Sequence, residues 1–226
     1  MHKVIAVVSG GMDSVTMAHQ LHSDGHDLFL LSVNYGQRHL KEHRFAAATA
    51  QRLGVRHEVA DLSPVARFLK GSSLTDPDVD VPERSWSSFG ESPNIVPNRN
   101  ALLLSVAFAV AVAERAEAVA IGTVANDHAS VPDSTPEFLE SFIAMERIAT
   151  AGHASPELDL LAPLSQVGKT GVVEIGERLG VPWLETWSCF RGGDLHCARC
   201  AACTERREAF AATGVTDSTR YEEPVA

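Results

Sequence analysis

The segment VVSGGMDSVTMA, residues 7–18, joins a short apolar run to a stretch with the pattern of a helix. The apolar run, residues 3–8, has the composition of a strand that is buried on both faces. Between them, residues 9–14 read SGGMDS, in which glycines allow the backbone to approach a ligand closely. Successive backbone N–H groups at a helix start favour anions. The segment therefore predicts a strand, a pyrophosphate-binding loop and a helix in succession.

Two features of this loop bear on its ligand. Asp13 is unexpected in a loop that binds anions, unless a divalent cation lies between it and the phosphates. The glycine spacing does not match the dinucleotide fingerprint, and Gly168-Lys169-Thr170 lacks the first glycine of a Walker loop, because Pro163 stands there. The alternative is a Gly-Ser turn that only begins a helix, with Asp13 in solvent.

Strand-like and helix-like segments alternate along the rest of the chain. Strands are predicted at 3–8, 27–33, 56–62, 117–122 and 158–163, and helices at 12–23, 38–53, 98–116, 136–150 and 168–179. This alternation predicts a doubly wound α/β fold with a parallel sheet. Ligands of such sheets bind at the carboxyl ends of the strands, where residues 9–14 lie.

One connection does not fit this alternation. Residues 70–97 are rich in Ser, Pro and Asp and are too long for an ordinary loop. We expect either a disordered segment or a functional loop over the site.

Composition limits the class of protein. The 226 residues suit one domain, and 45% hydrophobic residues are enough for a core. The first strand follows the N-terminus directly, and no apolar run reaches the length of a membrane span. A net charge of −10 argues against a broad basic face for nucleic acid. We expect a cytoplasmic protein that binds neither nucleic acid nor membrane.

All the cysteines lie within one short stretch near the C-terminus. They are Cys189, Cys197, Cys200 and Cys203. Four closely spaced thiolates are typical of a structural Zn(II) site. An iron–sulfur cluster is the rival, and four uncoordinated buried cysteines are the third possibility. His196 adjoins Cys197 and is a less favoured ligand, expected beside the site or in solvent. We predict an α/β domain that carries the pyrophosphate-binding loop at residues 1–185 and a zinc-binding segment at residues 186–226.

The loop SGGMDS after a first strand resembles the signature of the PP-loop ATP pyrophosphatases, also called N-type ATP pyrophosphatases. Further stretches narrow the resemblance. They are VNYGQRHLKE (33–42), PNIVPNRNALLLSVA (93–107), VPDSTPEF (131–138), APLSQVGKTGVVEIG (162–176) and the cysteine segment (186–217). Together they resemble the QueC family of 7-cyano-7-deazaguanine synthases over nearly the whole chain.

This resemblance implies an ATP-dependent ligase of the queuosine and 7-deazapurine pathways. Family members adenylate 7-carboxy-7-deazaguanine, form an amide with ammonia, and convert the amide to a nitrile with a second ATP. It also implies Mg(II) with ATP, and a homodimer. The implied phosphate-binding residues are Ser9, Gly10, Gly11, Asp13, Ser14 and Lys169, and the implied substrate-binding residues are Gln37, Arg38, Arg99, Asp127 and Asp133. Asp13, Lys169 and Arg99 carry the implied catalytic roles: Asp13 orients Mg(II) or the loop, and Arg99 binds the α-phosphate or the substrate carboxylate.

The expected nucleobase pocket departs from the family. The usual pattern is close to DYSGYPDCRPEF, whereas residues 127–138 read DHASVPDSTPEF. Both tyrosines, the cysteine and the arginine are replaced, while Asp127 and Asp133 remain and could accept hydrogen bonds from a guanine edge. The alternative for Asp133 is helix capping before Pro136. Two other functions stay open: a diverged enzyme that stops at the amide or uses another amine, and a zinc-stabilised nucleotide-binding module without turnover.

Overall fold

A five-stranded parallel sheet forms the centre of the molecule in the computed structural model, which describes residues 1–83 and 92–222. Part of the predicted long connection, residues 84–91, lies outside the described residues. The strand order is β3-β2-β1-β4-β5, with all neighbours parallel. The strands are β1 (Lys3–Val7), β2 (Asp27–Asn34), β3 (Arg56–Asp61), β4 (Ala118–Ile121) and β5 (Asp159–Leu161). The order reverses between β1 and β4, which creates a crevice at their carboxyl ends.

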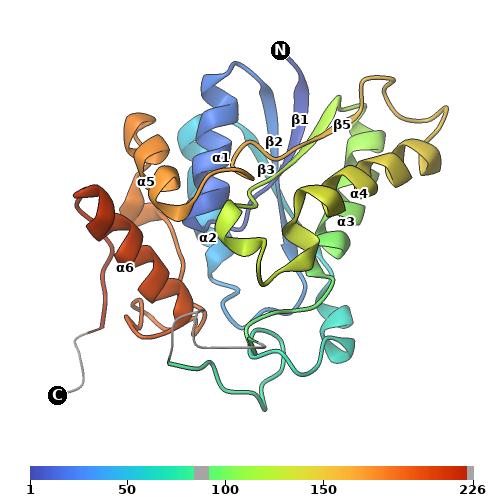
Figure 1. Cartoon of the computed structure of the whole chain (residues 1–226). Coiled ribbons are helices and arrows are strands. Elements are labelled where there is room, and N and C mark those ends of the chain that lie inside the picture. Colours follow the sequence, from blue (N-terminus) through green and yellow to red (C-terminus); the bar gives the residue numbers. More distant parts are fainter. Residues whose placement is uncertain (84–91, 223–226) are drawn as a thin grey trace.

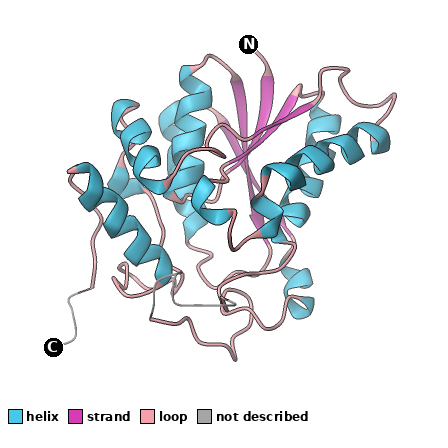
Figure 2. Ribbon diagram, viewed as in Figure 1, coloured by secondary structure: helices cyan, strands magenta, loops and turns pink. Residues whose placement is uncertain are grey.

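Helices cover both faces of this sheet, as Figures 1 and 2 show. The helices are α1 (Met12–Ser23), α2 (Glu42–Leu53), α3 (Arg99–Glu114), α4 (Pro136–Ala149), α5 (Lys169–Arg178) and α6 (Ala201–Thr213). Val4 and Ala6 of β1 pack with α1, α2, α5 and α6, whereas Ile5 and Val7 pack with α3 and α4. Because both faces of β1 are buried, its sequence is continuously apolar. The doubly wound α/β prediction is confirmed. In the described part of the chain, no helix has both the length and the apolar character needed to cross a membrane.

The predicted helix at 38–53 begins too early. The helix starts at Glu42, because residues 35–41 form a turn after β2 in which Gly36 has φ +87°. Arg38 therefore lies in a loop, and Glu42 occupies the first helical position.

The C-terminal segment packs against the main core. Ala209 and Phe210 of α6 belong to the cluster around β1, and the Phe210 ring meets the Trp183 ring edge-on at 5.1 Å between centroids. The proposed division at residues 1–185 and 186–226 stays a prediction, since α6 shares its apolar contacts with α5 and α1.

Candidate active site

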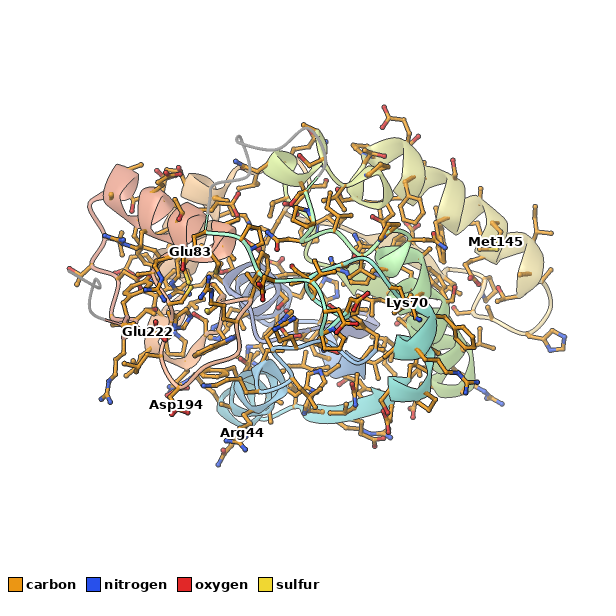
Figure 3. All side chains as sticks on the ribbon, turned by 90° about the horizontal axis from the view of Figure 1, so that it is seen from below. Arg44, Lys70, Glu83, Met145, Asp194 and Glu222 are labelled. Carbon is orange, nitrogen blue, oxygen red and sulfur yellow. The ribbon has the colours of Figure 1, made fainter. Side chains whose placement is uncertain are left out.

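A cavity opens at the carboxyl ends of β1, β2 and β4, on the side of the molecule that Figure 3 views. We call its two parts the phosphate end and the β2 end. The phosphate end is lined by Ser9, Gly11, Asp13, Ser14, Asp127, Lys169 and Glu205. The β2 end is lined by Tyr35, His39, Glu42, Leu74, Asn94, Ile95, Val96, Arg99, Leu103 and Phe190. The structure thus brings most of the predicted site residues into one space.

The loop of residues 9–14 is held by its own serines. The Gly11 N–H donates to Ser9 Oγ at 3.2 Å, and Ser14 Oγ donates to the Gly11 carbonyl at 3.2 Å. The two hydroxyls also lie 3.3 Å apart. Gly11 is the N-cap residue of α1 and offers no side-chain cap, so the N–H groups of the first helical turn are available for an anion.

Gly10 is required by packing as well as by conformation. Its φ is +93°, a region that side chains with a Cβ rarely adopt. An added Cβ would lie 2.8 Å from the Ala46 N atom and 2.9 Å from Phe45 Cβ, and closer still to the Glu42 carbonyl. The first turn of α2 therefore packs directly on the loop, and the glycine makes this approach possible.

An ion-pair group occupies the phosphate end. Lys169, the first residue of α5, donates to Asp13 Oδ2 at 2.6 Å and lies 3.5 Å from Glu205 Oε2. Burial alone would lower the pKa of Lys169, but the carboxylates of Asp13, Glu205 and Asp127 raise it above its usual value. Burial raises the pKa of Asp127 and raises that of Glu205 to about 7. Lys169 is therefore a permanent cation beside the loop.

One carboxylate oxygen of Asp13 is available to bind a ligand. Its Oδ1 atom is buried and has no hydrogen-bond partner among the described residues. An unsatisfied carboxylate oxygen beside the loop predicted to bind phosphates is suited to a hard divalent cation such as Mg(II). The residues present thus fit the cation that the resemblance implies.

Arg99 lies at the β2 end, at the start of α3. Its Nε and Nη2 atoms donate to Asn100 Oδ1 at 3.3 and 3.1 Å, and its guanidinium also pairs with the Tyr35 hydroxyl. The side chain lines the cavity, so a role toward a bound anion is consistent with its position.

Asp133 is engaged by the backbone of α3. Its Oδ2 atom accepts from the Asn100 N–H at 2.7 Å, and its carbonyl accepts from Asn100 Nδ2 at 2.9 Å. It therefore caps the start of α3, whereas Thr135 caps α4 by accepting from the Phe138 N–H at 3.3 Å. The alternative prediction, that Asp133 caps the helix beginning at Pro136, is wrong, because Asp133 caps α3 instead. Contact between Asp133 and a nucleobase stays a prediction.

Gln37 and Arg38 are not among the described residues that line the cavity. Arg38 donates to the carbonyls of Ser73, Asp76 and Val79, which holds residues 73–79 against the turn after β2. Gln37 is buried and donates to the Glu42 side chain at 3.0 Å. Their substrate contact stays a prediction, and their observed bonds are to the protein.

The four cysteines form a compact buried cluster. Their sulfur atoms all lie within 4.8 Å of one another, and Cys197 Sγ lies 3.9 Å from Cys203 Sγ. Backbone N–H groups of Cys197 and Cys200 point at Cys189 Sγ and Cys197 Sγ at 3.4 and 3.3 Å. This cluster fits a structural metal site. His196 is outside it, and its Nε2 atom accepts from the Ser188 N–H at 3.0 Å.

The cysteine segment contacts the phosphate loop directly. The Trp187 N–H donates to the Gly10 carbonyl at 2.8 Å, and the Trp187 ring packs on Phe45 and beneath the Lys41 ammonium. Glu205, two residues after Cys203, reaches Lys169. Glu83 pairs with Arg191 at 2.9 Å and Arg199 at 3.2 Å, and Figure 3 labels Glu83 on the same side of the molecule as this segment.

Sequence reasoning missed many residues of the cavity wall, and four with polar side chains adjoin the predicted ones in sequence or in space. They are Tyr35, His39, Glu42 and Glu205. Three of them lie within the stretch YGQRHLKE that carried the resemblance, next to Gln37 and Arg38, which were chosen instead. A predicted helix start at Glu42 would have indicated this residue as a candidate for the site. No local sequence pattern indicates Glu205 as a site residue, because its closeness to Lys169 depends on how α6 packs against α5.

Comparison with known proteins identifies the family of this chain. The profile of the family described as "Queuosine biosynthesis protein QueC" matches residues 3–214. A protein of Rhizobium rhizogenes and one of Agrobacterium fabrum, both named 7-cyano-7-deazaguanine synthase, are each 46% identical over 222 residues, which is 98% of this chain and 93% of theirs.

Among solved structures, NMN synthetase from Francisella tularensis superposes with a TM-score of 0.52 at 18% identity, covering 96% of this chain and 79% of that one. A protein from Methanocaldococcus jannaschii, described as a predicted subunit of tRNA methyltransferase, gives 0.50 at 16% identity, over 99% and 94% of the two chains. These two likenesses concern the fold alone. The match along almost the entire sequence shows that the chain belongs to the QueC family.

Proposed function

We propose that this protein is an ATP-dependent ligase that converts 7-carboxy-7-deazaguanine and ammonia to 7-cyano-7-deazaguanine. The observation that carries the proposal is the intact phosphate end: an uncapped helix start, the loop of residues 9–14 and the Lys169–Asp13 pair, in a chain of this family. A module that only binds nucleotide has no need for a buried cation shared by three carboxylates.

The reaction balances without water as a reactant. The substrate carboxylate attacks the α-phosphorus of ATP, and pyrophosphate leaves. Ammonia attacks the acyl carbon, AMP leaves with one carboxyl oxygen, and the amide loses a proton. The amide oxygen then attacks the α-phosphorus of a second ATP, pyrophosphate leaves, and loss of AMP and of both protons from nitrogen gives the nitrile. Both carboxyl oxygens therefore end in AMP.

The phosphate end supports the pyrophosphate-forming steps by positioning and charge. The N–H groups at the start of α1 and the two serine hydroxyls face the β- and γ-phosphates. Lys169 stabilises the negative charge that develops as pyrophosphate leaves. Asp13 fixes Lys169 through Oδ2, and its free Oδ1 would hold Mg(II), which neutralises phosphate charge when bound.

Arg99 and Asp127 complete the proposed reaction centre. Arg99 lines the β2 end, where a guanidinium can pair with the substrate carboxylate or the α-phosphate. Asp127 lines the phosphate end near Lys169, so its proposed partner is a polar group of the substrate. Asp133 supports Arg99 by capping α3, and Gln37 and Arg38 support the turn after β2.

We propose Zn(II) as the metal of the cysteine cluster. A tetrahedral ion with Zn–S bonds of about 2.3 Å separates its sulfurs by about 3.8 Å, and the Cys197–Cys203 separation is 3.9 Å. A four-iron cluster binds each cysteine through a different iron and needs more widely spaced sulfurs. Four bare thiols would leave their mutual spacing unexplained. Cys189, Cys197, Cys200 and Cys203 would hold the ion, whose role is structural.

Three further proposals follow from the resemblance. Ammonia is the nitrogen donor, the active form is a homodimer, and the consumption of ATP suggests the cytoplasm as its place of work. The altered sequence at residues 127–135 favours one second candidate, a relative that adenylates a deazaguanine carboxylate but stops at the amide or uses another amine or a protein.

The test is to identify the product made from ATP, Mg(II), ammonium and 7-carboxy-7-deazaguanine by mass spectrometry. The proposal predicts the nitrile with two AMP per molecule. The amide with one AMP, or an adduct of a different amine, would select the second candidate. Absence of AMP would leave only nucleotide binding.

A further inference from the structure

Three buried polar side chains at the β2 end have no role in the phosphate chemistry. Glu42 and His39 are each 6% exposed and Asn94 is 3% exposed, and all three line the cavity. Polar groups at this depth need hydrogen-bond partners, because burial without them costs free energy. The cavity therefore contains hydrogen-bonding capacity that the protein itself does not use fully.

Two atoms of this group have no partner among residues 1–83 and 92–222. They are His39 Nδ1 and Asn94 Nδ2. The orientation of Asn94 is set by Ser73, whose hydroxyl donates to Asn94 Oδ1 at 2.6 Å, so the amide N–H groups remain as donors. The structure thus leaves one donor and one ring nitrogen for a ligand.

Glu42 is held in place from behind. Gln37 Nε2 donates to Glu42 Oε1 at 3.0 Å, while Gln37 Oε1 accepts from the Tyr35 N–H at 3.0 Å. His39 Nε2 lies 3.4 Å from Glu42 Oε2. Burial raises the pKa of Glu42 to about 8 and lowers that of His39 to about 3, so neither group forms a strong ion pair within the protein. Each carboxyl oxygen keeps a lone pair for a further donor.

The walls around these groups suit a flat heteroaromatic ring. They consist of Leu74, Ile95, Val96 and Leu103, together with the Tyr35 and Phe190 rings. Pockets for small molecules commonly combine such an apolar lining with a few fixed polar groups.

We infer that Glu42 binds the guanine edge of the deazaguanine substrate, accepting hydrogen bonds from its ring N1–H and its 2-amino group, while Asn94 donates to the 6-oxo group. A carboxylate offers two adjacent acceptors, and this edge offers two adjacent donors followed by an acceptor. The two donors of the guanine edge favour the ionised form of Glu42 on binding, whereas the same edge of adenine has one amino donor beside an acceptor and would need the protonated form. This inference rests on the proposed function.

Glu42 is better placed for this task than the two aspartates. Asp133 already accepts from the Asn100 N–H at 2.7 Å, and Asp127 lines the phosphate end, where Lys169 acts on it electrostatically. The guanine edge at Glu42 also explains how the base can be bound although the tyrosines and arginine of the usual pattern are replaced.

The test compares Glu42→Gln with Glu146→Gln. Glu146 is a matched control, because it is 8% exposed, lies in α4, and does not line the cavity. AMP release is measured while ATP and 7-carboxy-7-deazaguanine are varied in turn. We expect Glu42→Gln to lower kcat/KM for the deazaguanine by at least about 100-fold, since a glutamine amide opposes one of the two donors. The KM for ATP and the metal content should not change, and Glu146→Gln should resemble wild type.

A substrate analogue without the 2-amino group gives an independent measurement. Wild type should use it at least about 100-fold less well than the full substrate, whereas Glu42→Gln should barely distinguish the two. An unchanged deazaguanine KM in Glu42→Gln, or a raised KM for ATP alone, overturns the inference. If Glu42→Gln does not fold, equal use of both substrates by wild type overturns it instead.

Failure of the proposed function is a separate outcome. The proposed function is contradicted if the wild-type protein releases no AMP with 7-carboxy-7-deazaguanine. Calorimetric titration of that base into wild type and Glu42→Gln then decides the inference alone: tight binding lost in the variant supports it, and equal binding or none contradicts it.

Discussion

Replacing Gly10 with alanine should destabilise the fold and weaken ATP binding together, because one atom added at this position meets the first turn of α2. The backbone at Gly10 has φ +93°, and the new Cβ would lie within 3 Å of Phe45 Cβ and the Ala46 N atom. Two of its neighbours are backbone atoms, which cannot turn aside as a flexible side chain can. The loop of residues 9–14 or α2 must therefore move.

The magnitude has two parts. A side chain at positive φ costs about 1–2 kcal/mol, and overpacking a well-filled region costs about 1–3 kcal/mol. We expect Gly10→Ala to lower the free energy of unfolding by about 2–5 kcal/mol. Gly25→Ala is the matched control, because Gly25 has φ +83° but an added Cβ meets nothing within 4 Å. Gly25→Ala should lower the free energy of unfolding only by the cost of a side chain at positive φ, about 1–2 kcal/mol.

The assay is urea unfolding of both variants, followed by tryptophan fluorescence, with ATP binding measured by calorimetry. The midpoint should fall farther for Gly10→Ala at an unchanged slope, and only this variant should lose ATP affinity. Equal midpoints for the two variants would refute the packing of α2 on the loop. Normal ATP affinity in Gly10→Ala would refute the role of the loop geometry.

Three further predictions concern charge and metal. Asp13→Ala and Lys169→Ala should each lower AMP release by at least about 100-fold with circular dichroism and metal content unchanged; normal release from either variant contradicts its role. Cys203→Ser should lose the metal and unfold or aggregate, because structural zinc contributes folding free energy; elemental analysis that finds iron with sulfide, or a folded variant without metal, contradicts the assignment. Burial raises the pKa of Glu42 to about 8 above its ordinary 4.5, so folding takes up a proton and the free energy of unfolding should fall as pH rises from about 4.5 to about 8. Gln37, His39 and Arg99 face this group, and the pKa of His39, near 3, keeps that ring neutral through the window. In Glu42→Gln the free energy of unfolding should fall less over this pH range. Urea midpoints that change equally in wild type and Glu42→Gln between pH 5 and pH 8 would contradict this prediction.

The fold could be predicted because each strand and helix carries its own local signal. The run at residues 3–8 is apolar on both faces, and the helices begin or end at Pro136, Gly54 and similar residues. The beginning of α2 was the main error. Residues 38–41 have helical propensity, but the turn around Gly36 and the bonds of Arg38 to residues 73–79 determine their conformation.

The site was predictable only where residues close in sequence act together. The loop of residues 9–14 and the four cysteines are of this kind, and both form compact groups in the structure. Glu205 and Lys169 come together only through the packing of α6 on α5. Asp133 caps a helix that begins more than thirty residues before it, which no local pattern can reveal.

The most direct test of adenylation is the fate of the carboxyl oxygens. Wild-type protein is given ATP, Mg(II), ammonium and 7-carboxy-7-deazaguanine labelled with ¹⁸O at both carboxyl positions, and the nucleotide products are analysed by mass spectrometry. The account predicts two AMP per nitrile, each carrying one ¹⁸O in its phosphate group, with unlabelled pyrophosphate. ADP with ¹⁸O in inorganic phosphate, or AMP without the label, would contradict it, because the carboxylate would then not attack the α-phosphorus.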